Sequence, residues 1–137
     1  MTPEQRAARR DSLSLVRATT VANLLATIAG REDQPAGQVF KNVQLMKDMP
    51  AKRFLIAMDS TFARALSRDC TSCHVPTDYA DDSRPGKVRA RIMIAMMNAI
   101  NTEHLTKMPA GRGGNTPIIN CMTCHRGNGN PGNAILP

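Results

Sequence analysis

Four cysteines occur in this 137-residue chain, and all of them belong to two copies of one pattern, Cys-x-x-Cys-His. The residues are Cys70, Cys73 and His74 in the first copy, and Cys121, Cys124 and His125 in the second. In this pattern the two thiols can add to the vinyl groups of a haem, and the histidine that follows is placed to bind its iron. We therefore predict two covalently bound haem c groups, anchored by the four cysteines and ligated by the two histidines.

Two other kinds of site also use paired cysteines. Two Cys-x-x-Cys pairs supply the four thiolates of a structural zinc site. However, such a site has no need of the histidine after each pair, and the pairs lie further apart in this chain than in a usual zinc ribbon. A thioredoxin-like dithiol is expected beside a β-α-β pattern, and neither pair has one. Haem attachment is therefore the favoured interpretation.

The second axial ligand of each iron decides whether a haem carries electrons or binds small molecules. Met58 lies on an apolar helix face twelve residues before Cys70, where the helix can fold back over the first haem. For the second haem, helical spacing leaves three methionines open: Met93, Met96 and Met97. Any of them can instead be a packing residue, since thioether side chains fill irregular gaps. His104 offers a bis-histidine site, but a lone polar histidine after a helix end is more often solvated.

The composition suits a chain that packs around large apolar cofactors. Aromatic residues make up only 3%, with no Trp, whereas there are nine Met. Lys and Arg outnumber Asp and Glu by 18 to 11, which gives a formal charge of +7. This excess is spread along the chain without basic runs between aromatics, which argues against nucleic-acid binding. It favours association with an acidic redox partner protein instead.

Thioether attachment of haem takes place in an oxidising compartment outside the bacterial inner membrane. We therefore expect an exported protein, periplasmic or extracellular, with any membrane association made through a partner. Residues 1–30 carry basic residues before a weakly apolar stretch that threonines interrupt, which fits an amphipathic helix better than a signal peptide. No stretch approaches the roughly 20 apolar residues of a membrane span.

The apolar residues recur with a helical period, and no alternating strand pattern persists, so we predict a mainly α fold. Thr2 and Pro3 begin a helix that Gly30 ends, and along it five residues recur at helical spacing: Leu13, Val16, Thr20, Leu24 and Ile28. Pro50 opens a helix that ends just before Cys70 and presents Phe54, Leu55, Met58, Phe62, Ala65 and Leu66. A further helix runs from Lys87 to Asn101 and presents Val88, Ile92, Met93, Ala95, Met96, Ala99 and Ile100.

One unit therefore occurs twice: an amphipathic helix with Met on its apolar face, a turn of variable length, and Cys-x-x-Cys-His. Residues rich in Gly, Pro, Asp or Ser predict loops over 75–86 and 108–117 and an irregular tail over 127–137. We expect a small di-haem c-type cytochrome with two such helix-turn units and long loops. An N-terminal helix and linker occupy 1–36 and the di-haem domain 37–137, in one compact body.

Three segments resemble the cytochrome subunit of bacterial photosynthetic reaction centres: 39–45 with 54–58, the run VRARIMIAMMNAIN at 88–101, and CMTCHRG at 121–127. The resemblance covers roughly residues 37 to 128 of this chain, and this stretch is similar to the N-terminal half of that tetrahaem protein. It implies methionine as the sixth ligand of both haems, and by position it assigns Met58 to the first and Met93 to the second. This chain has only two Cys-x-x-Cys-His frames, and the second half of the family protein is absent. The resemblance therefore does not imply that this chain binds a reaction centre.

These observations predict an electron carrier and not an enzyme. Basic residues form a possible docking rim, with a plain solvated helix face as the alternative: Lys47, Lys52, Arg53, Lys87 and Arg89. One competing function is a haem enzyme or small-ligand sensor, such as a peroxidase, in which one iron has an open position. Another is a subunit of a polymeric cytochrome chain, in which His104 ligates a haem of a neighbouring copy.

Overall fold

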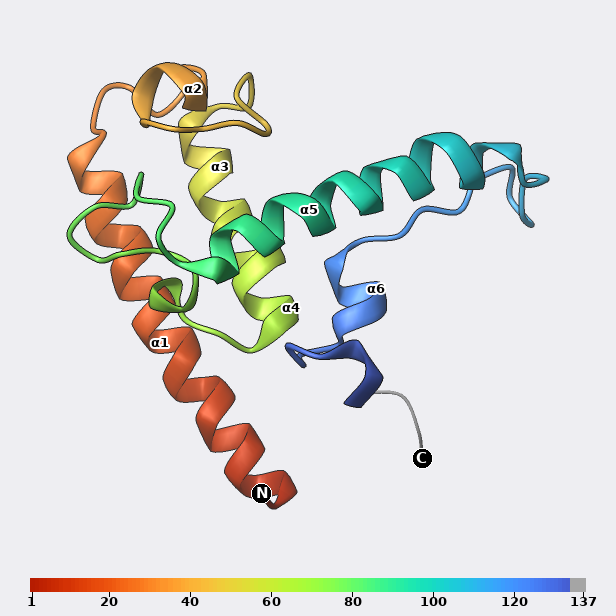
Figure 1. The fold of residues 1–137 in the computed structure, drawn as a ribbon, viewed down its shortest axis with the longest axis horizontal. Coiled ribbons are helices and arrows are strands. Elements are labelled where there is room, and N and C mark those ends of the chain that lie inside the picture. The colour runs from red at the N-terminus through yellow and green to blue at the C-terminus, as the bar shows by residue number, and fades with distance from the viewer. Residues whose placement is uncertain (134–137) are drawn as a thin grey trace.

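The computed structural model describes residues 1–133 and shows a helical protein. The end of the predicted tail, 134–137, lies outside the described residues. No β-strand forms within residues 1–133, where pairing is limited to isolated bridges such as Pro35 with Pro50. The predicted mainly α class is therefore confirmed. Figure 1 shows α1 beside α3 and α4, with α5 extending away from them and α6 lying below α5.

Helix α1 (Pro3–Thr27) begins where the sequence predicts. The Thr2 hydroxyl accepts a hydrogen bond from the Gln5 amide at 3.2 Å, and the Gln5 side chain accepts one from the Thr2 amide at 2.8 Å. This reciprocal capping box satisfies two of the amides that a helix start leaves without partners. Gly30 follows the helix with a φ of +81°, a conformation that favours glycine and turns the chain away.

The buried face of α1 differs from the prediction at one position. Val16 is half exposed, whereas the neighbouring Arg17 is only 6% exposed. The guanidinium of Arg17 donates to the Asp59 carboxylate at 2.6 Å and to the Arg68 carbonyl at 3.2 Å. An ion pair with a residue far along the chain therefore places a charged side chain on the inward face of α1.

The next helical stretch continues to the first haem frame. The short helix α2 (Ala36–Val39) leads to a loop, and α3 (Ala51–Ala57) starts directly after Pro50, as predicted. The chain then passes through the π-helical segment η1 (Met58–Ala63) into α4 (Arg64–Leu66). Met58 is therefore the first residue of a π-helical segment, a feature that often occurs at functional sites.

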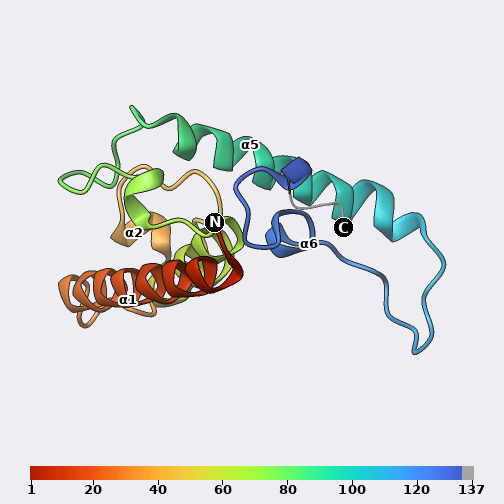
Figure 2. The same cartoon turned by 90° about the horizontal axis from the view of Figure 1, so that it is seen from below.

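Helix α5 (Pro85–Ala99) begins two residues before the predicted Lys87, because Pro85 suits the first helical turn. It continues through the π-helical segment η3 (Ile100–His104) and the 3₁₀ turn η4 (Leu105–Lys107), beyond the predicted end at Asn101. The remaining elements are short: the 3₁₀ turn η2 (Cys70–Ser72), the helix α6 (Cys121–His125) and the 3₁₀ turn η5 (Pro131–Asn133). Figure 2 shows α1 and α5 on opposite sides of the molecule.

The polypeptide forms only a small apolar core of its own. Ile28, Ala51 and Leu55 make one buried cluster, and Phe40 and Phe54 stack beside it with ring centroids 5.7 Å apart. On α5 most of the predicted apolar face is exposed, contrary to the expectation that it is buried: Val88, Ile92, Met93 and Met96 all face outward from the polypeptide, and Ile94 is the buried apolar residue of this helix. An apolar row of this kind suits contact with a large apolar group.

Candidate haem-attachment sites

The first Cys-x-x-Cys-His frame starts at a capped turn. Asp69 directly precedes Cys70, and its carboxylate accepts hydrogen bonds from the Thr71 hydroxyl at 2.8 Å and from the Ser72 amide at 3.1 Å. These bonds, led by the one from Thr71, hold the pKa of Asp69 below its ordinary value. The His74 amide donates to the Cys70 carbonyl at 2.9 Å, which closes the turn and brings both thiols and the imidazole to one place.

The second frame forms the short helix α6 in the same manner. Asn120 caps this helix. Its side-chain oxygen accepts a hydrogen bond from the backbone amide of Thr123 at 3.2 Å, and its backbone amide donates to the Thr123 hydroxyl at 3.0 Å. The preceding residue is held by Asn101 of η3, whose side chain donates to the Ile119 carbonyl and accepts from the Ile119 amide, both at 2.8 Å. The helix that carries Met93 therefore also fixes the entry to the second frame.

Both frame histidines are oriented by a backbone carbonyl. The Nδ1 atom of His74 lies 3.0 Å from the Tyr79 carbonyl oxygen, and Nδ1 of His125 lies 3.0 Å from the Asn128 carbonyl oxygen. A carbonyl can only accept a hydrogen bond, so Nδ1 carries the proton and Nε2 keeps its lone pair. This is the arrangement that orients a metal-binding histidine from its outer side. Both rings therefore suit the role of proximal iron ligand.

Burial shifts the pKa of ionisable groups in both frames. Burial lowers the pKa of His74, so the ring is neutral at physiological pH, which is the form that binds a metal. Burial also raises the pKa of three thiols, those of Cys70, Cys73 and Cys121. None of the four cysteines forms a disulfide. Within residues 1–133 no three His, Cys, Asp or Glu side chains gather into a metal-binding group.

The candidate distal residues lie on the two helices that precede the frames. Met58 is half-buried at the junction of α3 and η1. On α5, Met97 is half-buried, whereas Met93 and Met96 are exposed on the face that Val88 and Ile92 share. His104 ends η3 and is exposed. The structure thus keeps each methionine on the helix of its own unit, and the choice among those of α5 stays a prediction.

The two units contact each other through their frames. The Gly127 amide, just after α6, donates to the Ala65 carbonyl of α4 at 2.8 Å, which joins the second frame to the first helical stretch. In the other direction, Gly86 at the start of α5 packs against Ser72 and Cys73 of the first frame. Helix α5 therefore serves both sites: its first turn contacts the first frame, and its middle carries the methionines predicted for the second.

Lys87 is not part of a docking rim, contrary to the sequence prediction. It is only 8% exposed, and its ammonium donates to the carbonyls of Tyr79, Ala80 and Asp81 at 2.8 to 2.9 Å. The other four rim residues are exposed: Lys47, Lys52, Arg53 and Arg89. Sequence reasoning also missed the capping residues Asp69 and Asn120, although Asp or Asn directly before a short helix is a recognisable capping signal.

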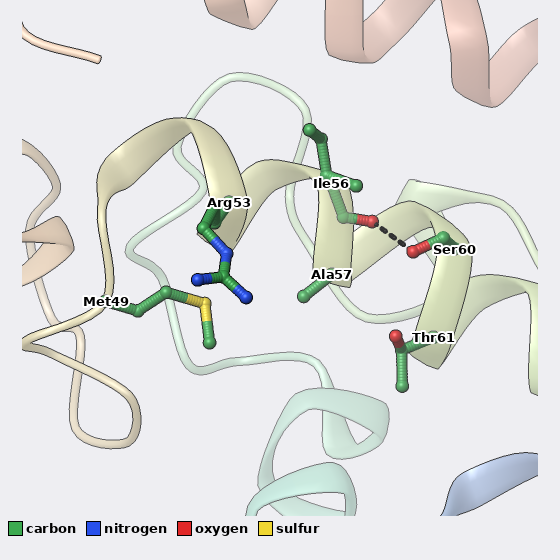
Figure 3. A pocket seen from close by; sticks show the side chains of 6 residues that line it. All are labelled: Met49, Arg53, Ile56, Ala57, Ser60 and Thr61. Atoms are coloured by element: carbon green, nitrogen blue, oxygen red, sulfur yellow. Dashed lines mark hydrogen bonds between the residues drawn. The ribbon is translucent and has the colours of Figure 1, made fainter. Parts of the chain in front are cut away.

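A shallow pocket of about 280 Å³ lies on α3 and η1, separate from both frames. Figure 3 shows its side chains, with the Arg53 guanidinium beside Met49 and the Ser60 hydroxyl donating to the Ile56 carbonyl. None of the predicted anchoring or ligating residues lines it. The pocket is therefore not a candidate for the haem sites.

Comparison with known proteins assigns the chain to a family. A family described as photosynthetic reaction centre cytochrome C subunit matches residues 4–136. The chain belongs to this family. It is 32% identical over 121 residues to the photosynthetic reaction center cytochrome c subunit of Thermochromatium tepidum, which covers 88% of the chain and 28% of that protein. It is 30% identical over 110 residues to cytochrome c-554 of Chloroflexus aurantiacus, covering 75% and 26%.

Membership of the reaction-centre cytochrome family implies covalently bound haem c, and the anchoring and ligating groups described above fit that cofactor. The chain spans little more than a quarter of the length of these relatives. A third relative, the subunit of Rubrivivax gelatinosus, is 33% identical over 111 residues, which are 80% of the chain and 28% of that protein. Within residues 1–133, no helix has both the length and the apolar character needed to cross a membrane.

Proposed function

We propose that the chain is a di-haem c-type cytochrome that carries electrons between redox partner proteins. The observation that carries this proposal is the matched placement of His74 and His125. Each ring follows two cysteines on a capped turn, and each donates from Nδ1 to a carbonyl at 3.0 Å, leaving Nε2 for iron. Haem c at each frame supplies one-electron chemistry when bound, and the chain's own residues anchor, orient and shield it.

We propose Met58 and Met93 as the distal ligands. Both lie on the helix that precedes their own frame, which is the arrangement that the family resemblance implies. Met58 starts a π-helical segment, and Met93 shares an exposed apolar face with Ile92 and Val88. Thioether ligation favours ferrous iron, so both sites are expected at higher potential than bis-histidine haems.

The proposed partners are acidic or membrane-bound redox proteins. Exposed basic residues are available near both units: Lys47, Lys52, Arg53 and Arg89, and also Arg6, Arg9, Arg10 and Arg68, which line a pocket together with Asn128. Such a charge distribution speeds association with an acidic surface and makes the rate sensitive to salt. We place the protein in the periplasm or outside the cell, where haem attachment occurs, with membrane association made through a partner.

The test is an optical titration of protein matured in a host that exports it and attaches haem c. Two haems per chain, a methionine-to-iron charge-transfer band in the oxidised protein and no spectral change with carbon monoxide after reduction are expected. One haem per chain would contradict the di-haem proposal. A carbon monoxide shift in the wild-type protein would favour the haem enzyme or sensor instead. Sedimentation of the same sample tests the polymeric alternative, in which exposed His104 ligates a haem of a second copy.

A further inference from the structure

One backbone carbonyl connects the first frame histidine to a buried cation. The Tyr79 carbonyl oxygen lies 3.0 Å from Nδ1 of His74 and accepts a hydrogen bond from the Lys87 ammonium at 2.9 Å. Lys87 is the third residue of α5, so this link also joins the helix of the second unit to the histidine of the first. A buried positive charge therefore lies one carbonyl away from the imidazole of His74.

The ammonium is held in a defined place. Its three N–H donors match three backbone carbonyls, those of Tyr79, Ala80 and Asp81, all within 2.9 Å. The Asp82 carboxylate lies 2.9 Å from the same nitrogen. Burying a charge is tolerated when it is hydrogen-bonded and paired in this way. Lys87 is therefore a fixed charge and not a flexible surface side chain.

Lys87 shares its counter-ion with a second cation. The Asp82 carboxylate also pairs with Arg91, whose guanidinium lies 3.0 Å from the second carboxylate oxygen, and Asp81 is a further carboxylate close to Lys87. Hydrogen bonds from Arg91 and then Lys87 hold the pKa of Asp82 well below its ordinary value, so the carboxylate stays ionised. Of these charges, Lys87 is the one that is both buried and hydrogen-bonded to the carbonyl that orients His74.

Within residues 1–132, whose side chains are described, the second site shows no equivalent of this link. There, His125 is the one side chain that donates to the Asn128 carbonyl. The four arginines that line an open pocket together with Asn128 are all exposed: Arg6, Arg9, Arg10 and Arg68. Water and salt screen exposed charges far more than buried ones. The two histidines thus share one hydrogen-bond geometry, but only the carbonyl that faces His74 also accepts a hydrogen bond from a buried cation.

We propose that Lys87 is a positioning residue that selectively raises the reduction potential of the first haem site. This inference rests on the proposed function. A nearby positive charge favours the reduced state, because reduction lowers the positive charge of the site by one. Lys87 also competes for the Tyr79 carbonyl, which weakens the hydrogen bond from His74 and so reduces electron donation to the iron. Both effects have the same sign.

The test compares the midpoint potentials of both sites in haem-loaded, full-length variants. Lys87→Met is expected to lower the ferrous-to-ferric equilibrium constant of the first site about tenfold, which is about 59 mV for one electron. The second site is expected to stay unchanged. Asp82→Asn removes the counter-charge while keeping the three carbonyl contacts of Lys87, so it is expected to raise the first potential. Arg91 is a cation that makes no hydrogen bond to the Tyr79 carbonyl. Arg91→Met is therefore expected to lower the potential of the first site by less than Lys87→Met.

These variants distinguish an electrostatic role from a merely structural one. Loss of packing would not move the potential in opposite directions for Lys87→Met and Asp82→Asn. If Lys87→Met does not fold, Asp82→Asn carries the test. Unchanged potentials, equal shifts at both sites, or shifts of the same sign in both variants would overturn the inference. The potentials are assigned with Cys121→Ala/Cys124→Ala, in which only the first frame can attach haem.

The haem count per chain is measured first and keeps the two proposals apart. One haem per chain would contradict the di-haem function but leave Lys87 testable at the first frame. If two haems are bound and the midpoint potential of the first site is unchanged in Lys87→Met and Asp82→Asn, only this inference is overturned and the di-haem proposal stands.

Discussion

Gly86 and Ser72 lie so close that a Cβ atom on the glycine would stand 2.6 Å from the carbonyl oxygen of the serine. The same atom would lie 3.2 Å from Sγ of Cys73. Helix α5 therefore begins in direct contact with the first haem frame. Backbone atoms cannot move aside as the end of a flexible side chain can, so this contact requires glycine.

Gly86→Ala is accordingly expected to destabilise the protein by about 1–3 kcal/mol, the usual range for forcing a methyl group into a packed site. Urea unfolding of the variant measures the change. Gly111→Ala is the matched control, because its added Cβ would meet its nearest neighbour, the Asn115 carbonyl, at an ordinary 3.8 Å. Equal stability of the two variants would show that the start of α5 moves freely.

Met93→Ala is expected to open the second haem site to carbon monoxide. The loss of a thioether ligand leaves a position that the reduced iron can offer to a small molecule, so about half of the haem absorbance should shift. Met96→Ala, on the same exposed face of α5, is the control and should leave the spectrum unchanged. The reverse result would move the ligand from Met93 to Met96.

Met58→Ala is expected to open the first haem site in the same way. The readout is a carbon monoxide shift in the other half of the haem absorbance, together with loss of half of the methionine-to-iron charge-transfer band. Met49→Ala serves as control, since Met49 lines the shallow pocket on α3 away from the frames. If the absorbance of reduced Met58→Ala does not change when carbon monoxide is added, Met58 is not a ligand of the first haem.

Arg17→Met is expected to lower the free energy of unfolding by about 2–3 kcal/mol. Removing one partner of a buried ion pair leaves the other without compensation, and the partial exposure of Asp59 reduces the usual cost. Arg10→Met, an exposed change on the same helix, should have almost no effect. A double-mutant cycle with Asp59→Asn isolates the pair, and a coupling near zero would mean that α1 docks by apolar contacts alone.

Asp69→Asn is expected to make the protein less sensitive to acid. The pKa of Asp69 is lowered in the folded state from an ordinary 3.8, mainly by the Thr71 hydroxyl. As pH falls, the Asp69 carboxylate is therefore protonated in the unfolded chain, near pH 3.8, before it is protonated in the folded protein. The stability that the ionised carboxylate contributes is lost as pH falls from 3.8 through the lower pKa of the folded state. Asn cannot titrate, so the variant should show a shallower fall in stability below pH 3.8. An unchanged acid profile in urea unfolding would contradict this role.

Local signals in the sequence predicted the starts of the three main helical stretches well. Thr2 with Pro3, and Pro50, act on neighbouring residues alone, so two of these helices begin where these residues stand. Lys87 was misjudged and the burial of Arg17 was missed, because the partners of both side chains are set by tertiary structure. Arg17 meets a carboxylate that is distant in the chain, and Lys87 meets carbonyls of a folded-back loop.

The π-helical segments were missed for a different reason. The segments η1 and η3 directly follow α3 and α5, so apolar periodicity predicted continuous helix there and did not distinguish the i→i+5 bonding of the wider turn. The two Cys-x-x-Cys-His frames can be read from the sequence without the fold. Their orientation, with both Nδ1 atoms turned to carbonyls, depends on the loops after His74 and His125 and follows only from the structure.

Because α5 contacts the first frame at Gly86 and carries Met93 seven residues later, the separation of these two points is a length of uninterrupted helix, about 10 Å at 1.5 Å per residue. Adding or deleting one residue between them would change that length only slightly but would rotate Met93 by about 100° around the helix axis. Insertions and deletions should therefore be tolerated in the loop at 108–118 and rejected between 86 and 93. The chain can diverge widely in sequence while the register of this one segment stays fixed.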